Sequence, residues 1–471
     1  MTCMSHILYH QGQDNEVFTL LQDDLDTKNR TFLTYSAAHW GIHAQRYVSD
    51  KLDEATMMFL LMRGQEYLSD KVGGTWKRVH TLSPCHVVVL FGLSRLLPQM
   101  AHLHQPDPAS KCNALHVALQ TGDQATVQAL LQMPMGVPHL DINAESGGVI
   151  PLIHAVKERD VALIRLLFGY AGEPPLDPNV VTAQGENALT LASRNGFGDV
   201  VTALLQYRPH RGPSVDLNTL DRDGWTPLLL AAREGYAEVV KALLDYEGQG
   251  SLDINATTKG GRTALMIASW RGHTEVVKAF TQDSGRSVDV NARDEHSLTA
   301  LLYAAREGHT DVVEALLARR SNPALDVEAR AEGGLTALML ASLHGHVKVV
   351  KALLDYPGTP PVRVSAVSDD GWTALMYACW EGRIRVVEAL LAHPHAFMAE
   401  GGPPEDTRGA CLDMAFQRLR TSAGFNDELR YLDRQNLAKL LYPAINAAGG
   451  RLPLPTPAAF HPDPARVPDA C

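Results

Sequence analysis

The chain has 471 residues and a formal net charge of -11, with 45% hydrophobic and 20% charged residues. These proportions are typical of a soluble globular protein. The negative charge argues against broad binding to a phosphate backbone, which needs clustered Lys and Arg, and leaves room only for a local basic patch. Six scattered cysteines form no CxxC pair and no Cys/His ligand spacing, so we expect a reducing compartment, no disulfide framework and no zinc site.

Residues 1–80 contain no repeat, and we expect a helical N-terminal cap or linker region there. The start, MTCMSHILYHQGQDNE, lacks a basic region followed by an apolar core, so no secretory signal peptide is expected. The longest apolar stretch, around residues 85–93, is too short to span a bilayer. These observations predict an intracellular, cytoplasmic protein with no membrane association, the nucleus being the alternative location.

From about residue 83 to residue 399 one segment recurs in a single register. TPLLLAAREGYAEVVKALL from Thr226 superposes on TALLYAAREGHTDVVEALL from Thr299, and we call the first residue of each copy its anchor. The first two anchors are 30 residues apart, and later ones are 36 to 39 apart. The nine anchors are Ser83, Asn113, Ile150, Asn187, Thr226, Thr263, Thr299, Thr336 and Thr373. A fixed period of this length indicates a repeat architecture.

Each repeat carries the start and stop signals of two short helices. Thr226 is a suitable N-cap, and Pro227 follows it where a missing N–H costs nothing. Glycine recurs nine residues after the anchor, as in Gly235, and is expected to end the first helix with a positive φ. Pairs such as Val239–Val240 then predict the apolar stripe of a second helix. The linkers, such as LDIN from Leu252, read as extended segments that lead into a glycine-containing turn.

This pattern of helix, turn, helix and hairpin loop resembles the ankyrin repeat over roughly residues 83–399. The resemblance implies an all-α repeat solenoid of about nine units, with the array at residues 81–400, expected to be monomeric and to bind proteins. Three features depart from the family pattern. The period exceeds the usual 33 residues, with the surplus in loops such as Asp245–Ser251. Histidine of the family's T-P-L-H survives only at His86 and His116. Arg159 replaces the glycine of its repeat, at a cost of about 1 kcal/mol if the positive φ is retained.

The two ends of the array are interpreted separately. Residues 401–448 are expected to form a modified C-terminal capping repeat, and residues 449–471, with six prolines, a disordered tail. LPLP at Leu452–Pro455 resembles the end of a SOCS box, although the cysteine-containing helix expected before it is missing. YSAAHWGIHA at Tyr35–Ala44 resembles the segment that joins an NTPase module to the ankyrin array in fungal NACHT-type receptors, and it is equally readable as an N-terminal cap. The chain has no GxxxxGK[ST] motif, so the NTPase itself is not encoded here.

No motif in the chain carries catalytic chemistry. HExxH, GxSxG and GxGxxG are absent, as is any kinase signature. The histidines His273, His309 and His346 fall at the Gly-His step of the ankyrin pattern and are read as structural. The methionines at positions 266, 339 and 376 occupy one repeat position and are read as core, and Asp369–Asp370 as solvated turn residues. We therefore expect no enzyme, no catalytic residue, no metal and no cofactor.

The repeat position also indicates where a partner would bind. The resemblance implies contacts at the hairpin tips and on the outward side of the first helix, which together line a concave groove. Tryptophan and arginine, the residue types that dominate interface energetics, are frequent at these positions, which are anchor −1, +7 and +8. The alternative for Trp225 and Trp372 is packing between adjacent hairpins. The predicted partner-binding residues are Trp225, Arg233, Glu234, Arg262, Trp270, Arg271, Leu298, Arg306, Glu307, Leu335, Leu343, His344, Trp372, Trp380 and Glu381.

Three functions remain open at this point. The first is a non-enzymatic scaffold that binds a protein partner of unknown identity through the groove. The second is the ligand-sensing part of a fungal NACHT-like receptor without its NTPase. The third is a substrate adaptor for a ubiquitin ligase, with the C-terminal tail as the recruiting element. Nucleic acid is not expected as the partner.

Overall fold

The computed structural model describes residues 69–72, 75–78 and 114–393, except for 123, 133–140, 146–148, 173, 209–211, 249–250, 283–286, 320–323 and 359–360. The chain divides into two compact units. Unit 1 comprises residues 1–192 and 199–216, and unit 2 comprises residues 193–198 and 217–471. The repeat predicted from Ser83, the segment Tyr35–Ala44, the cap at 401–448 and the tail at 449–471 lie outside the described residues.

Unit 1 contains two helix pairs in its described part. The first helices of the pairs pack against each other, as do the second helices. Their bounds are Ala114–Thr121 (α6), Gln124–Leu131 (α7), Pro151–Lys157 (α8) and Val161–Phe168 (α9). The predicted repeats from Asn113 and Ile150 are thereby confirmed. The next pair, Ala188–Asn195 (α10) and Gly198–Leu205 (α11), contains the boundaries between the two units.

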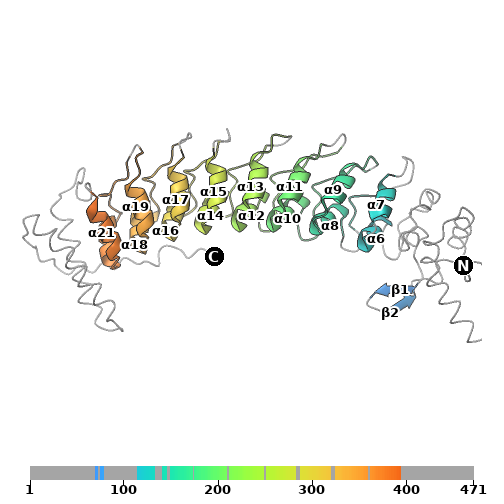
Figure 1. Cartoon of the computed structure of the whole chain (residues 1–471), viewed down its shortest axis with the longest axis horizontal. Coiled ribbons are helices and arrows are strands. Elements are labelled where there is room, and N and C mark those ends of the chain that lie inside the picture. The colour runs from blue at the N-terminus through green and yellow to red at the C-terminus, as the bar shows by residue number, and fades with distance from the viewer. Residues whose placement is uncertain are drawn as a thin grey trace, which may run out of the picture. The chain divides into compact units, whose positions relative to one another are not determined.

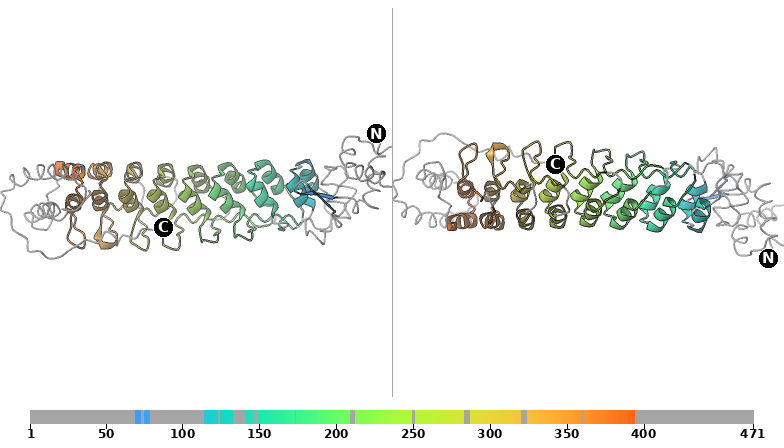
Figure 2. Two further views of the ribbon diagram at one scale, coloured as in Figure 1. Left: turned by 90° about the horizontal axis from the view of Figure 1, so that it is seen from below. Right: turned by 90° about the horizontal axis from the view of Figure 1, so that it is seen from above.

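Unit 2 contains five consecutive helix pairs within its described residues (Figure 1). In each pair the two helices contact each other, and each helix also packs on its counterpart in the next pair. Viewed from below and from above, the helices form two rows, with the hairpin loops beside them (Figure 2). The pairs are Pro227–Glu234 (α12) with Ala237–Leu244 (α13), Ala264–Arg271 (α14) with Thr274–Thr281 (α15), Ala300–Glu307 (α16) with Thr310–Leu317 (α17), Ala337–His344 (α18) with Val347–Leu354 (α19), and Ala374–Trp380 (α20) with Ile384–Ala392 (α21). The array is the predicted all-α repeat solenoid.

The first helices of unit 2 begin at the predicted threonine caps. The Thr226 hydroxyl accepts the backbone N–H of Leu229 at 3.3 Å, and Pro227 occupies the first turn. Three repeats add a bond in the reverse direction, in which a methionine sulfur accepts the anchor's own N–H at 3.3 to 3.5 Å. The three methionines are Met266, Met339 and Met376, which are 0%, 1% and 7% exposed. Their predicted place in the core is confirmed, and they help to cap the helix as well.

Glycine at anchor +9 meets two constraints at once. In the described repeats this glycine has φ between 67° and 85°, as predicted. In Gly272 a Cβ would also lie 2.7 Å from Nδ1 of His309 in the next repeat, closer than side chains tolerate. Arg159 takes the same conformation with φ 54°, so the strain expected from its side chain is retained. At Gly196, Gly235, Gly272 and Gly308, glycine is therefore favoured both by the turn and by the aromatic ring packed over it.

The histidines at anchor +10 join neighbouring repeats. Each stands at the N-cap of a second helix, with its Nε2 atom within hydrogen-bond distance of the carbonyl at anchor +7 of the preceding repeat. The pairs are His273 to Arg233 at 3.1 Å, His309 to Trp270 at 3.0 Å and His346 to Arg306 at 2.9 Å. The predicted structural role of these residues is confirmed. Because each carbonyl belongs to an anchor +7 residue, this bond also helps to place the predicted binding surface.

The linkers form a second set of inter-repeat bonds, built on asparagine. The Asn255 side-chain amide donates to the Ser287 carbonyl at 3.1 Å, and its Oδ1 accepts the Asp289 N–H at 2.9 Å. The same two bonds occur at Asn143, Asn179, Asn218 and Asn291. At the next step Glu328 stands in place of asparagine and accepts one bond, from the Arg363 N–H at 2.8 Å. We call this set the linker ladder.

A two-stranded hairpin lies within the N-terminal region that the sequence suggested to be helical. Strands Ser69–Val72 (β1) and Thr75–Arg78 (β2) pair antiparallel, with Val72 opposite Thr75. The helical prediction for residues 1–80 is therefore wrong for these eight residues. The physical reason is the Gly73–Gly74 pair between them in the sequence, since two consecutive glycines permit the tight turn of a hairpin and disfavour a helix.

For a membrane span and for cysteine pairing, the structure speaks only of the described residues. None of the described helices is both long and apolar enough to cross a membrane. Cys379 is a buried free thiol, and the other five cysteines lie outside the described residues.

Candidate functional site

The candidate site comprises anchor positions −1, +7 and +8 of the five repeats of unit 2. We call these 15 residues, which are the predicted partner-binding set, the tip surface. Position −1 directly precedes the anchor, and in four of the five repeats a side chain at anchor −5 accepts its backbone N–H. Asp221 Oδ1 accepts the Trp225 N–H at 2.8 Å, and Ser368 Oγ accepts the Trp372 N–H at 3.1 Å. Because these bonds are local to the loop, position −1 is held in place before any partner binds.

The side chains at −1 and +7 of one repeat meet each other in three of the five repeats. The Arg233 guanidinium carbon lies 4.9 Å from the centre of the Trp225 ring. In the next repeat the order is reversed, with Arg262 lying 5.6 Å from the Trp270 ring centre. These distances are typical of a cation–π interaction. The loop and the first helix are thus joined at the surface by a side-chain pair.

A buried polar cluster supports the second of these pairs. The Tyr303 hydroxyl donates to Asp294 Oδ2 at 2.5 Å, and Arg262 Nε lies 3.8 Å from the same oxygen. The rings of Trp270 and Tyr303 are 6.4 Å apart, and Arg262 lies 6.0 Å from the Tyr303 ring centre. Burial raises the pKa of Tyr303, and the hydrogen bond to Asp294 and its charge raise it further. The Tyr303 hydroxyl therefore stays protonated throughout the physiological pH range and donates a hydrogen bond to the Asp294 carboxylate.

Tyr303 and Asp294 were not among the predicted site residues. A signal was present in the repeat register, because the only two tyrosines at anchor +4 in these repeats, Tyr303 and Tyr377, each face a polar residue at anchor −5. Tyr377 bonds Ser368 in the corresponding way, with 3.2 Å between the two hydroxyl oxygens.

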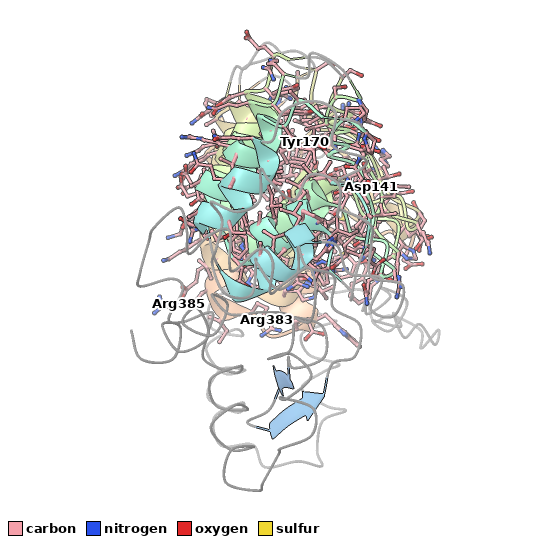
Figure 3. The ribbon with its side chains drawn as sticks, turned by 90° about the vertical axis from the view of Figure 1, so that its right-hand side faces the viewer. Asp141, Tyr170, Arg383 and Arg385 are labelled. Carbon is pink, nitrogen blue, oxygen red and sulfur yellow. The ribbon has the colours of Figure 1, made fainter. Side chains whose placement is uncertain are left out.

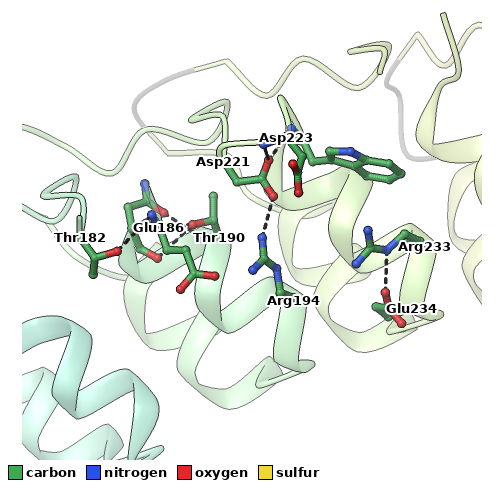
Figure 4. A network of polar contacts seen from close by, with 10 residues as sticks. Thr182, Glu186, Thr190, Arg194, Asp221, Asp223, Arg233 and Glu234 are labelled. Atoms are coloured by element: carbon green, nitrogen blue, oxygen red, sulfur yellow. Dashed lines mark hydrogen bonds and ion pairs between the residues drawn. The ribbon is translucent and has the colours of Figure 1, made fainter. Parts of the chain in front are cut away.

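Arginine at +7 has a different partner depending on the following loop (Figure 4). Arg194 reaches Asp221 of the next repeat at 2.7 Å, where the carboxylate side chain is only 1% exposed. After Arg233 the equivalent loop residue is Thr258, which cannot form an ion pair. Arg233 instead pairs with its own neighbour, Glu234, at 2.6 Å. Its guanidinium is thus held between a carboxylate and an aromatic face on the surface.

Arg306 follows the same rule as Arg233. The loop residue after it is Ala331, and Arg306 Nε pairs with Glu307 at 2.9 Å. The guanidinium lies 5.2 Å from the Tyr303 ring centre, and its side chain is 10% exposed. This arginine therefore contributes more to packing than the sequence pattern suggested.

The remaining predicted residues divide by exposure. Leu298 is buried, 3% exposed, so its inclusion in the partner-binding set is wrong. The Leu298 N–H bonds Asp294 at 2.8 Å, as the Trp225 N–H bonds Asp221, so this bond alone does not set the exposure of the position. The half-buried members are Trp225, Arg233, Arg262, Trp270, Arg306, Leu335, Leu343, Trp372, Trp380 and Glu381, and the exposed ones are Glu234, Arg271, Glu307 and His344.

Among the described residues, no group of three or more His, Cys, Asp or Glu side chains is arranged to hold a metal ion. The His296 ring nitrogens lie 3.6 Å from Glu295 and 3.5 Å from Glu332, so this histidine has two carboxylate neighbours. The described part of the surface offers aromatic rings, guanidinium groups and carboxylates, which are groups that recognise other proteins.

The chain matches one family model and is similar to solved structures. A family model described as ankyrin repeats in three copies matches residues 152–255, 250–327 and 323–399, a span of 248 of the 471 residues. The chain is similar to the crystal structure of an ankyrin repeat protein, EF0377, with 24% identity and a TM-score of 0.38, over 44% of this chain and 97% of that one. It is also similar to the ankyrin repeat domain of Bcl-3, described as a unique member of the IkappaB protein family, with 25% identity and a TM-score of 0.42, over 52% of this chain and 99% of that one. No curated protein matches the chain.

Proposed function

Since this chain belongs to the ankyrin-repeat family, we propose that it is a non-enzymatic scaffold that binds a protein partner through the tip surface of unit 2. Ankyrin repeats are protein-interaction modules in general, and the proposal concerns which face of this chain is used. The observation that carries it is the set of half-buried tryptophan and arginine side chains at anchor −1 and +7.

These side chains are already ordered by contacts within the chain. Trp270 lies under Arg262 and also under Arg271, whose guanidinium carbon is 5.4 Å from the ring centre. Trp372 and Trp380 pack on each other with ring centres 5.6 Å apart. Side chains that are held before binding lose less conformational entropy when a partner arrives. Large aromatic and arginine side chains of this kind are the residues that most often dominate binding energy.

The proposal is tested by capture of proteins from lysate of the native organism. The double variant Trp270→Ala/Trp380→Ala removes two aromatic contacts from the tip surface, and we expect it to lose the main captured protein. The matched control is Glu275→Ala/Lys278→Ala, which removes an exposed ion pair of 2.9 Å on the second helix α15. Circular dichroism and thermal unfolding establish that both variants are folded. Equal capture by the tryptophan variant and the wild type would contradict the proposal, as would equal loss in the control.

The receptor and ubiquitin-ligase readings depend on Tyr35–Ala44 and residues 449–471. Both segments lie outside the described residues, and no observation in the described part favours either reading.

A further inference from the structure

The repeat anchored at Thr263 differs from its two neighbours at position +8. This repeat carries Arg271 there, whereas the repeats before and after it carry Glu234 and Glu307. Each glutamate pairs with the arginine one position before it, with 2.6 Å and 2.9 Å between the carboxylate oxygen and the arginine Nε. In the Thr263 repeat that arginine is replaced by Trp270. A positive charge therefore stands where both neighbouring repeats supply a carboxylate.

Two guanidinium groups lie over the Trp270 ring. The guanidinium carbon of Arg271 is 5.4 Å from the ring centre, and that of Arg262 is 5.6 Å from it. Arg271 is exposed and Trp270 is half-buried, while only 16% of the Arg262 side chain is exposed. The indole thus gathers two positive charges at one place on the tip surface, and Arg271 is the more accessible of the two.

Asp294 is the carboxylate recorded beside this cluster within the described residues, and other donors already engage it. Its Oδ1 accepts the backbone N–H groups of His296 at 3.0 Å and Leu298 at 2.8 Å, and its Oδ2 accepts the Tyr303 hydroxyl at 2.5 Å. Arg262 Nε lies 3.8 Å from Oδ2, beyond hydrogen-bond distance. Asp294 therefore attracts Arg262 by its charge but leaves that guanidinium without a hydrogen-bonded carboxylate.

Arg271 has no carboxylate partner in the part of the chain that the structure describes. Its guanidinium forms no hydrogen bond and no ion pair there, and its recorded contact is with the indole ring. Arg383 and Arg385 at the start of α21 show the contrast (Figure 3). Arg383 Nε donates to the Leu343 carbonyl at 3.3 Å, and Arg385 lies 3.5 Å from Glu388 on the same helix. The charge of Arg271 is thus held on the surface without a neutralising group beside it.

We propose that Arg271, together with Arg262, binds the carboxylate of an aspartate or glutamate side chain on the partner protein, beside the Trp270 ring. The preceding repeat supplies the pattern, because Arg233 lies over a tryptophan ring and pairs with a carboxylate at 2.6 Å. A guanidinium can stack on an aromatic face and pair with a carboxylate at the same time. At Trp270 the chain supplies the ring and the guanidinium, and the partner supplies the carboxylate. This inference rests on the proposed function, since it names the group that one part of the tip surface recognises.

The probe is acetyl-glutamate amide, titrated at low ionic strength into the ¹⁵N-labelled full chain while the indole and arginine Nε–H signals are followed by NMR. Trp270→Phe and Arg271→Gln assign the two signals of the site. We expect saturable shifts of both in the millimolar range, weakened by added salt. Acetyl-glutamine amide has the same shape without the charge, and it should bind about fivefold more weakly or worse, the size expected for an exposed ion pair. Equal binding of the glutamine and glutamate probes would overturn the proposal.

Two variants and one control keep the test sharp. Arg271→Glu installs the residue that both neighbouring repeats carry at this position, so it should fold and lose glutamate binding. Arg271→Lys keeps the charge without the planar group and should weaken binding about twofold or more. The matched control Lys348→Ala removes an exposed positive charge from α19, at a side chain with no recorded ion pair among the described residues, and should bind like the wild type. Unchanged binding to Arg271→Glu would contradict the proposal, as would an equal loss in the control.

A phosphate arm distinguishes the other anionic group that proteins carry. If acetyl-phosphoserine amide binds more than about tenfold more tightly than the glutamate probe, beyond what its extra charge explains, a phosphorylated residue is the occupant and the proposal fails. The proposed function is judged separately by protein capture. If the Trp270→Ala/Trp380→Ala variant loses its partner while the glutamate probe does not bind the wild type, the scaffold function stands and this inference falls.

Discussion

The linker ladder and the tip surface lie in the same repeats, but the residues of the ladder recur from repeat to repeat and those of the tip surface vary. Along the linker the same asparagine makes the same two bonds at Asn218, Asn255 and Asn291. On the tip surface the −1/+7 pair changes from Trp–Arg to Trp–Trp within five repeats. The bonds that hold neighbouring repeats together tolerate little change because each repeat must offer the same groups to the next. The surface is free to vary because its side chains mostly satisfy one another within a repeat.

The largest loss of stability is expected where an added side-chain atom would clash with the neighbouring repeat. Gly272→Ala adds a Cβ at φ 75°, 2.7 Å from Nδ1 of His309. We expect a loss of about 2 to 3 kcal/mol in the free energy of unfolding, from strain and overpacking together. Gly382→Ala is the matched control, since φ is 67° there and no atom of the described residues lies within 4 Å of the added Cβ. It should cost about 1 kcal/mol. Equal losses in urea unfolding would show that the ring contact contributes nothing.

A smaller loss is expected when one step of the linker ladder is broken. Asn255→Ala removes the bonds to Ser287 and Asp289, and should lower the free energy of unfolding by about 1 to 2 kcal/mol. Glu328→Ala removes the single bond to Arg363, and should cost about half as much. Chemical unfolding of the two variants side by side measures the difference. A greater cost at Glu328 would mean that asparagine is not the stronger connection.

The histidine bonds predict a moderate dependence of stability on pH. Burial lowers the pKa of His346 from its usual value of 6.5, and the charges of His344 and Arg383 lower it further against the opposing effects of the Arg306 carbonyl and Glu307. Below about pH 6.5 the unfolded chain therefore binds the proton more readily than the folded chain, so stability falls as the pH drops. The stabilising contribution is present above pH 6.5. Thermal unfolding between pH 7.5 and 5 measures the fall, and His346→Gln should reduce it. An unchanged slope in that variant would assign the dependence to other groups.

The smallest change in stability is expected at Arg159, which stands where the other repeats have glycine. Arg159→Gly relieves a positive φ of 54°, worth about 1 kcal/mol, but loses the exposed pair with Asp199 at 3.0 Å, worth up to about 1 kcal/mol. We expect net stabilisation of about 0.5 kcal/mol or less. Arg159→Ala loses the pair without the relief and should be less stable than the glycine variant. Equal melting temperatures of the two variants would show that the φ strain at this site is negligible.

Local rules predicted most of the frame. The threonine caps and the glycine turns follow from interactions within a few residues, and both are present, whereas the positive φ of Arg159 was considered only as a condition. The methionine sulfur bonds to the anchor N–H are also local, but methionine is seldom a cap and its sequence position suggested only burial. The hairpin at β1 and β2 was missed, although its glycine pair is a local signal.

The sequence suggested which repeat positions carry the candidate site but not how their side chains interact. The two positions assigned to the predicted binding surface, anchor −1 and +7, contact each other in three of the five repeats, as Trp225 and Arg233 do, and partner binding there stays a prediction. The repeat register wrongly included Leu298, which is buried, and it missed Tyr303 with Asp294. Asp221 and Asp294 bond the anchor −1 N–H in the same way, yet Trp225 is half-buried and Leu298 is buried, so the exposure of this position cannot be predicted from the turn alone.

By itself the sequence determined the helices, their ends and the register of the repeats, because each depends on contacts between residues close along the chain. The partners of individual side chains were decided only by the tertiary structure. Arg194 pairs with Asp221 across repeats, whereas Arg233 turns back to Glu234 because the next loop offers Thr258 instead of a carboxylate. The Arg194–Asp221 contact joins residues of neighbouring repeats, and it depends on how the helix pairs stack. The stacking brings an arginine of one repeat to the loop of the next, and the residue found there determines its partner.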